Sequence, residues 1–205
     1  MNYLDLARTQ VTGSIDDLKS LTNLTNLDLR NTQTSGNISD LKALTNLTSL
    51  DLYGTQVTGD IRDLKALTNL TSLHLYNTQT PITGDINVLS TTKCATISLK
   101  GGKFTGDIAI LPDACKFISF SDDKGSAFTW GTRPSTAKII AIEGNASLTN
   151  IDKMLQDQAQ CQVGFISSDP SYYKTIEIAG NRTSASDAAV ATLQEKGYTI
   201  KIAKA

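Results

Sequence analysis

The sequence has little of what catalytic, metal-binding or membrane proteins usually require. It contains one histidine, one tryptophan, three cysteines and four prolines in 205 residues. No C-x-x-C, H-E-x-x-H or phosphate-binding glycine motif is present, so we expect no metal, cofactor or nucleotide. The net charge of −1 gives no electrostatic reason to bind nucleic acid. No apolar run approaches the roughly 18 residues of a membrane-spanning helix.

What the sequence does contain is an internal repeat. Residues 21–43 read LTNLTNLDLRNTQTSGNISDLKA, residues 44–66 read LTNLTSLDLYGTQVTGDIRDLKA, and residues 67–79 read LTNLTSLHLYNTQ. The tripeptide L-x-L recurs every 23 residues, at Leu27, Leu50 and Leu73. A fixed period in the twenties with the pattern L-x-x-L-x-L indicates a solenoid in which each repeat forms one coil.

The L-x-L tripeptides predict one short strand per coil, because alternating apolar side chains point to the same face of a strand. Such strands stack in parallel, and we expect right-handed crossovers between them. Six leucines should therefore be buried: Leu27, Leu29, Leu50, Leu52, Leu73 and Leu75. The aspartates between them, Asp28 and Asp51, should be exposed.

The same turn chemistry follows each strand. Three residues after the second leucine stands a threonine whose hydroxyl is expected to bond the turning backbone; these are Thr9, Thr32, Thr55 and Thr78. A glycine comes next, which indicates a positive φ angle; these are Gly13, Gly36, Gly59, Gly84 and Gly106. The Ser, Asn or Asp after each glycine favours the start of a short helical or 3₁₀ turn.

The segments 21–38 and 44–61 closely resemble the leucine-rich-repeat family. The C-terminal segment NRTSASDAAVATLQEKGYTI is similar to the tail of secreted or surface-exposed bacterial leucine-rich-repeat proteins. The resemblance implies an α/β solenoid of the horseshoe type, with one short parallel strand per coil of about 23 residues. It also implies a concave sheet face that binds another macromolecule, often a protein. Threonine in place of the usual asparagine in the early ladder departs from the family pattern.

The chain is expected to divide into leucine-rich repeats at 1–121, with an incomplete first coil, and degenerate repeats with a cap at 122–205. Residues 122–134 contain tryptophan, glycine and proline and predict a loop. The cap should continue the solenoid, and a separate small domain is the alternative.

Two segments of the cap repeat the pattern L-x-L-x-x-N and place Asn145 and Asn181 in the ladder position. We therefore expect Ile140/Ile142, Ile176/Ile178 and Ile200/Ile202 to extend the same sheet. Larger helices are expected near 148–161 and 185–196.

Outward-facing residues of the expected concave face are the candidate ligand-binding residues: Asp28, Arg30, Asp51, Tyr53, His74, Tyr76 and Lys100. Tyrosine and arginine are enriched among the residues that dominate interface energies. Aspartates in register about 4.8 Å apart would repel one another, so the alternative is an acidic stripe that solvent stabilises. A calcium site is disfavoured because strand carboxylates alone supply too few oxygens.

Two further groups leave alternatives open. Cys94 and Cys115 occupy equivalent positions in adjacent coils, and they either form a disulfide or stay as buried thiols. Cys161 has no partner by spacing. His74 has Asp51 and serines on neighbouring strands, but no G-x-S-x-G motif accompanies it, so we do not expect catalysis.

These patterns predict a non-enzymatic binding module for a protein or glycan ligand, located outside the cell or at its surface. The alternative is a structural spacer that displays another domain. No signal peptide is visible at Met1, and the incomplete first coil predicts that the protein continues upstream.

Overall fold

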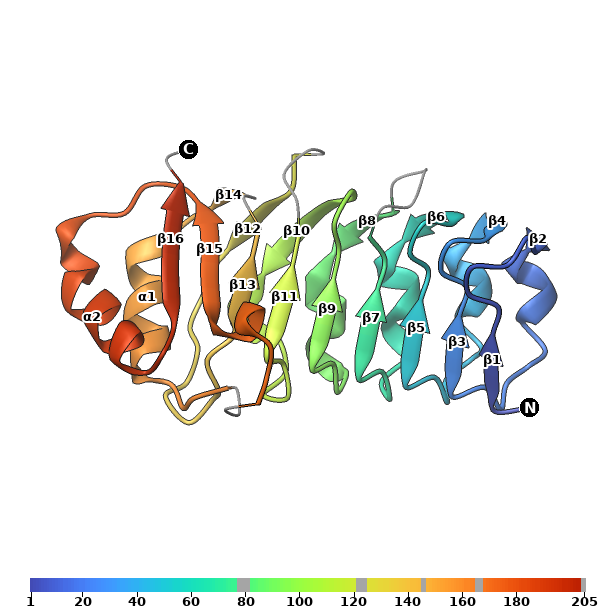
Figure 1. Cartoon of the computed structure of the whole chain (residues 1–205), viewed down its shortest axis with the longest axis horizontal. Coiled ribbons are helices and arrows are strands. Elements are labelled where there is room, and N and C mark those ends of the chain that lie inside the picture. The colour runs from blue at the N-terminus through green and yellow to red at the C-terminus, as the bar shows by residue number, and fades with distance from the viewer. Residues whose placement is uncertain (77–81, 121–124, 145–146, 165–167, 204–205) are drawn as a thin grey trace.

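The computed structural model describes residues 1–76, 82–120, 125–144, 147–164 and 168–203. Figure 1 shows an elongated molecule whose coils stack side by side from the N-terminus to the C-terminus, with larger helices at the C-terminal end. The sixteen strands found among these residues all pair in parallel within one open sheet. The expected parallel solenoid is therefore confirmed.

The predicted strands form the first ladder of the sheet. They are β1 (Tyr3–Asp5), β3 (Asn26–Asp28), β5 (Ser49–Asp51), β7 (Ser72–His74), β9 (Thr96–Ser98) and β11 (Phe117–Ser119). Each first leucine lies opposite the next, as Leu27 lies opposite Leu50 and Leu50 opposite Leu73. The six leucines predicted to be buried are at most 1% exposed. We call the outward side of this ladder the ladder face.

Each coil also carries a second strand that the sequence pattern does not predict. These strands are β2 (Thr12–Ser14), β4 (Gln33–Asn37), β6 (Gln56–Asp60), β8 (Ile82–Asp85), β10 (Lys103–Asp107), β12 (Ala127–Thr129) and β14 (Ser147–Leu148). Gly, Asn, Asp and Gln are poor strand formers, so this segment resembles a turn in isolation. Stacking decides otherwise, because every coil places the same segment beside its copy in the next coil. β12 lies within the predicted loop at 122–134, of which residues 125–134 are described.

A short 3₁₀ helix closes the third side of each coil, as the turn chemistry predicts. These helices are η1 (Ile15–Leu18), η2 (Ile38–Leu41), η3 (Ile61–Ala66), η4 (Ile86–Thr91) and η5 (Ile108–Ile110). Each begins after a polar cap, and at η2 the Asn37 side chain accepts a hydrogen bond from Ser39 N (2.9 Å) while Asn37 N donates to Asp40 (3.3 Å). The glycine before each cap has a φ between 118° and 130°.

The threonine ladder is present where the chain is described. The hydroxyls of Thr9, Thr32 and Thr55 each donate to the carbonyl oxygen of the second leucine of their own coil, at 2.6, 2.7 and 2.8 Å. Thr78 and Asn145 lie outside the described residues. Asn181 is exposed, unlike the buried Thr32 and Thr55.

The C-terminal third continues the sheet. β13 (Ala141–Glu143), β15 (Thr175–Ala179) and β16 (Thr199–Ala203) extend the first ladder. β15 also pairs with β14, so the two ladders meet there. The helices α1 (Ile151–Gln160) and α2 (Asp187–Glu195) lie within the ranges predicted for them, and they contact each other. Two short 3₁₀ helices, η6 (Ser171–Lys174) and η7 (Ser184–Ser186), complete the region.

The predicted register of β13 is wrong by two residues. Ile142, and not Ile140, lies opposite Ile118 in the position of the first leucine. Gly144 therefore takes the place of the second leucine, with a φ of 143°. A Cβ atom there would lie 1.9 Å from the carbonyl oxygen of Phe120, the residue in the same place on the previous coil. Only glycine permits this approach, so Ile140 and Ile142 do not take the places of the two leucines as predicted.

Candidate functional site

Two predicted aspartates are less exposed than expected. Asp51 is 9% exposed, and the side chain of Asp28 is 20% exposed. Each carboxylate turns back onto its own strand end, where Asp28 accepts from Arg30 N (3.1 Å) and Asp51 from Tyr53 N (3.0 Å). The prediction of exposure is wrong because these backbone bonds hold the carboxylates close to the sheet.

The aspartates also contact basic side chains. Arg30 Nε lies 3.2 Å from Asp28 Oδ2, and His74 Nδ1 lies 3.3 Å from Asp51 Oδ2. Burial raises the pKa of Asp28, and the neighbouring Asp51 carboxylate adds to this, while Arg30 opposes it. The row of aspartates is therefore partly neutralised by its own neighbours.

Two tyrosines form an aromatic stack beside these ion pairs. The ring centroids of Tyr53 and Tyr76 are 4.4 Å apart and the rings are 17° from parallel. His74 meets Tyr76 edge to face at 6.3 Å. Burial raises the pKa of the Tyr76 hydroxyl, with a smaller contribution from the Asp51 charge. Asp51, Tyr53, His74 and Tyr76 are thus joined by a chain of contacts, and the pair of Asp28 and Arg30 lies beside them because Asp28 is opposite Asp51 on the adjacent strand. We call these six predicted residues the tyrosine cluster.

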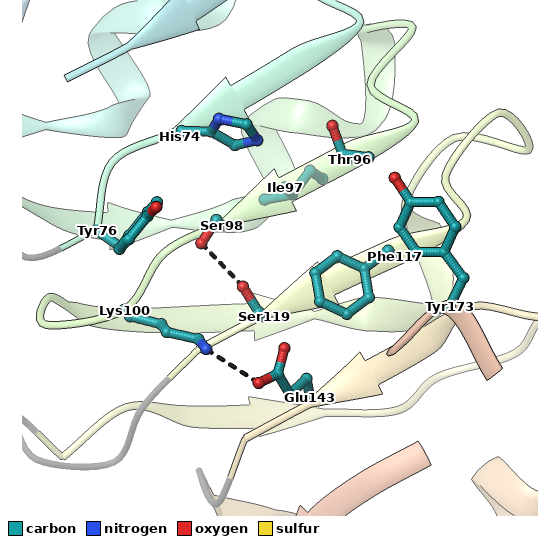
Figure 2. Close-up of a pocket in the computed structure, with 10 residues that line it drawn as sticks. All are labelled: His74, Tyr76, Thr96, Ile97, Ser98, Lys100, Phe117, Ser119, Glu143 and Tyr173. Carbon is teal, nitrogen blue, oxygen red and sulfur yellow. Dashed lines mark hydrogen bonds and ion pairs between the residues drawn. The ribbon is translucent and has the colours of Figure 1, made fainter. Parts of the chain in front are cut away.

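The seventh predicted residue, Lys100, lies apart from this chain of contacts. Its ammonium forms an ion pair with Glu143 Oε1 at 3.1 Å. Both line a hollow of about 360 Å³, together with His74, Tyr76, Thr96, Ile97, Ser98, Phe117, Ser119 and Tyr173 (Figure 2). Sequence reasoning missed Glu143 because it placed Ala141 in the outward column. It missed Tyr173 because η6 lies outside the repeat and no periodicity indicates its position.

The contacts of His74 include a serine as well as an aspartate. His74 Nε2 lies 3.4 Å from Ser72 Oγ, which also accepts from Thr96 Oγ1 at 3.1 Å. Acyl transfer needs backbone N–H groups aimed at the developing oxyanion. Here Ser72 N donates to Thr48 O and Thr96 N donates to Thr71 O within the sheet. We therefore interpret this group as a polar network on the ladder face, and the absence of catalysis stays a prediction.

Two other predicted alternatives can be compared with the geometry. Within the described ranges, no group of three or more His, Cys, Asp or Glu side chains is arranged to hold a metal ion. Cys94, Cys115 and Cys161 are free thiols in buried positions. Burial raises the pKa of Cys94 to about 11 and that of Cys115 to about 12. Of the helices in the described parts of the chain, none has the length and apolar character to cross a membrane.

Comparison with known proteins finds a family match within the repeats. The family model described as leucine-rich repeats in two copies matches residues 45–91. A search of curated proteins found no match. The chain resembles the solved structure of PEPR1–AtPEP1 with 19% identity and a TM-score of 0.58, over 100% of this chain and 35% of that one. At this identity the likeness shows the fold alone.

Other solved structures resemble the chain over different lengths. The BIR2 ectodomain from Arabidopsis thaliana is 30% identical over 51% of this chain and 57% of its own, with a TM-score of 0.45. An internalin from Listeria monocytogenes is 19% identical over 100% of this chain and 61% of its own, with a TM-score of 0.48. The chain thus spans less than two thirds of each structure that it matches here.

Proposed function

We propose that this leucine-rich-repeat solenoid is a non-enzymatic binding module that recognises a protein partner through the tyrosine cluster on its ladder face. The stacked pair of Tyr53 and Tyr76 carries the proposal. Tyrosine buries a large area at low conformational cost, and rings that already stack lose little further freedom on binding. Arg30 lies on the same face, and its ion pair with Asp28 restrains it.

The charges around the cluster indicate the chemistry of the partner. Asp5, Asp28 and Asp51 lie in register on adjacent strands, while Arg30 and His74 are the basic residues that contact them. The three carboxylates outnumber the single guanidinium of Arg30, so this part of the ladder face carries a net negative charge. A partner with basic side chains around an aromatic or aliphatic anchor complements this surface.

The test uses a matched pair of variants. Tyr53→Ala/Tyr76→Ala removes the stack, and Arg62→Ala changes an exposed residue on η3, away from the ladder face. Protein partners are captured from host and bacterial surface extracts with the unmodified protein, and their affinities are then measured. We expect the double variant to weaken binding by about 30-fold or more, as for a hot spot of about 2 kcal/mol. Arg62→Ala should have no effect.

The same experiment addresses the alternative role as a spacer. The function of a spacer does not depend on the tyrosine stack. If the double variant and Arg62→Ala capture the same protein partners to the same extent, the binding proposal is contradicted. Unfolding curves of both variants show whether either substitution has disturbed the solenoid.

We further propose that the protein is displayed outside the cell or at its surface. The resemblance of residues 181–200 to the tail of surface-exposed bacterial proteins supports this location. Protease treatment of intact source cells checks it: the protein should be digested while a cytoplasmic marker survives. Survival of both proteins would contradict the surface location.

Residues 122–205 are proposed to cap the repeats of 1–121. The continuation of the first ladder through β13, β15 and β16 supports this role, because the coil at β11 would otherwise present apolar side chains to water. A chain truncated after Ser121 should aggregate or unfold. A monomeric fragment with unchanged melting would instead support a separate domain.

A further inference from the structure

The hollow on the ladder face borders the stacked pair, with which it shares Tyr76, and it has its own chemistry. It is lined by residues of β7, β9, β11, β13 and η6. Figure 2 shows Phe117 and Tyr173 at one end, Tyr76 and Lys100 at the other, and Ser98 and Ser119 between them. Tyr53 does not line it. Its volume of about 360 Å³ lies at the lower end of the range for small-molecule sites, roughly 300–1,000 Å³.

One end of the hollow is aromatic. The ring centroids of Phe117 and Tyr173 are 5.4 Å apart, with the rings tilted by 50°. Phe117 belongs to the floor strand β11, whereas Tyr173 reaches the hollow from η6. Two elements far apart in the sequence thus meet to form one apolar wall, which can stack against a flat apolar surface of a ligand.

The floor is made of hydroxyl groups. Ser119 Oγ donates to Ser98 Oγ at 2.9 Å, and these residues are 2% and 9% exposed. A hydroxyl can donate one hydrogen bond and accept two. No hydrogen bond donated by the Ser98 hydroxyl is found to any residue that the structure describes, so this largely buried group retains a donor for a ligand.

The remaining lining residues set the charge of a suitable ligand. Lys100 and Glu143 pair with each other at 3.1 Å, so the hollow offers no unpaired charge of either sign from this pair. An apolar side chain of a ligand would displace the water that solvates Ser98, Glu143 and His74 and would form no hydrogen bonds with these residues in its place. Leaving these polar groups without partners is costly in free energy. The lining therefore favours a neutral ligand that carries many hydroxyls and one apolar face.

We propose that this hollow binds one sugar ring of a neutral oligosaccharide. A pyranose ring has C–H groups on one face, which stack on Phe117 and Tyr173, and hydroxyls around its rim. The rim hydroxyls bond to Ser98, Lys100 and Glu143. The hollow shares His74 and Tyr76 with the tyrosine cluster, whereas its aromatic wall at Tyr173 lies outside that cluster. Variants of Tyr173 therefore test the sugar site apart from the protein site.

The test measures binding of two neutral probes, N,N′,N″-triacetylchitotriose and maltotriose, to the full chain by saturation-transfer NMR and calorimetry. We expect at least one of them to bind in the millimolar range or tighter. Tyr173→Ala should weaken that binding at least tenfold, because it removes the outer ring of the wall. Tyr173→Phe keeps the ring and should retain binding. Arg62→Ala, on η3 and outside the hollow, should leave sugar binding unchanged.

Three results would overturn the sugar site. The first is that neither probe binds to the unmodified protein. The second is that Tyr173→Ala binds a probe as tightly as the unmodified protein does. The third is that no sugar binds at all, while Tyr173→Ala loses the binding of a protein partner. The last result would assign the hollow to the protein interface. Failure of the protein-binding proposal is seen separately, because it is read from Tyr53→Ala/Tyr76→Ala and a protein partner. Melting curves show whether Tyr173→Ala is folded.

Discussion

Gly144 is the position where one methyl group should disturb the solenoid most clearly. Its φ of 143° lies in a region that side chains rarely adopt, and a Cβ would meet the backbone oxygen of Phe120 at 1.9 Å. Backbone atoms cannot rotate away as a flexible side chain can. β13 must therefore move relative to β11 in Gly144→Ala.

Gly13→Ala is the matched control. Gly13 has a φ of 119°, but a Cβ there would meet nothing closer than Asp17 Oδ2 at 3.9 Å. Both substitutions should cost about 1–3 kcal/mol of backbone strain. Gly144→Ala should also weaken the bond from Phe120 N to Glu143 O, worth about 0.5–1.5 kcal/mol, and overpack Phe120 by about 1–3 kcal/mol. The difference between the two variants should be about 2–4 kcal/mol.

Urea unfolding followed by circular dichroism and by the fluorescence of Trp130 measures this difference. Trp130 is the single tryptophan and is buried in the C-terminal half, so it reports on the region around β13. The unfolding midpoint of Gly144→Ala should fall well below that of Gly13→Ala. Equal midpoints would show that the close approach of Gly144 to Phe120 does not constrain the register of β13.

The remaining predictions concern the core and the buried thiols. Leu50→Ala should lower the free energy of unfolding by about 2–5 kcal/mol, because a fully buried leucine leaves a cavity; an unchanged melting curve would contradict this. Gln158→Ala should cost about 2–5 kcal/mol, since Gln158 bonds a buried backbone N–H and C=O, whereas the exposed Gln156→Ala should cost less than about 1 kcal/mol. Cys94 and Cys115 should react with Ellman's reagent at pH 8 only after unfolding. Burial raises the pKa values of these thiols from 9.0 to about 11 for Cys94 and about 12 for Cys115, so the unfolded chain loses these protons at a lower pH than the folded chain does. The free energy of unfolding should therefore fall as the pH rises above about 9, and urea midpoints measured across that range would show the decrease.

The repeating parts of the fold are predictable because each coil repeats the same local pattern. The buried leucines, the threonine hydrogen bonds and the positive φ of the glycines all follow from residue type and spacing. The same local logic fails at β13. Ile140 and Ile142 alternate equally well in either register, and the observed register, with Ile142 opposite Ile118, brings Gly144 against the backbone of Phe120 in the previous coil.

The candidate site divides in the same way. Residues on the first ladder, such as Tyr53 and Tyr76, are placed by the 23-residue period, which brings equivalent positions together. Their packing is not set by the period, and it buries Asp51 where exposure was predicted.

The sequence by itself determined the period, the parallel stacking of coils and the column of outward residues, because these depend on local alternation and on the repetition of one pattern. Only the tertiary structure decided that a second strand forms in each coil, that Glu143 faces Lys100, and that Tyr173 lies against Phe117. Each of these depends on contacts between coils or between the repeats and the cap. A strand register or a side-chain position that depends on such contacts is favoured only once the residues that are distant in the sequence have come together.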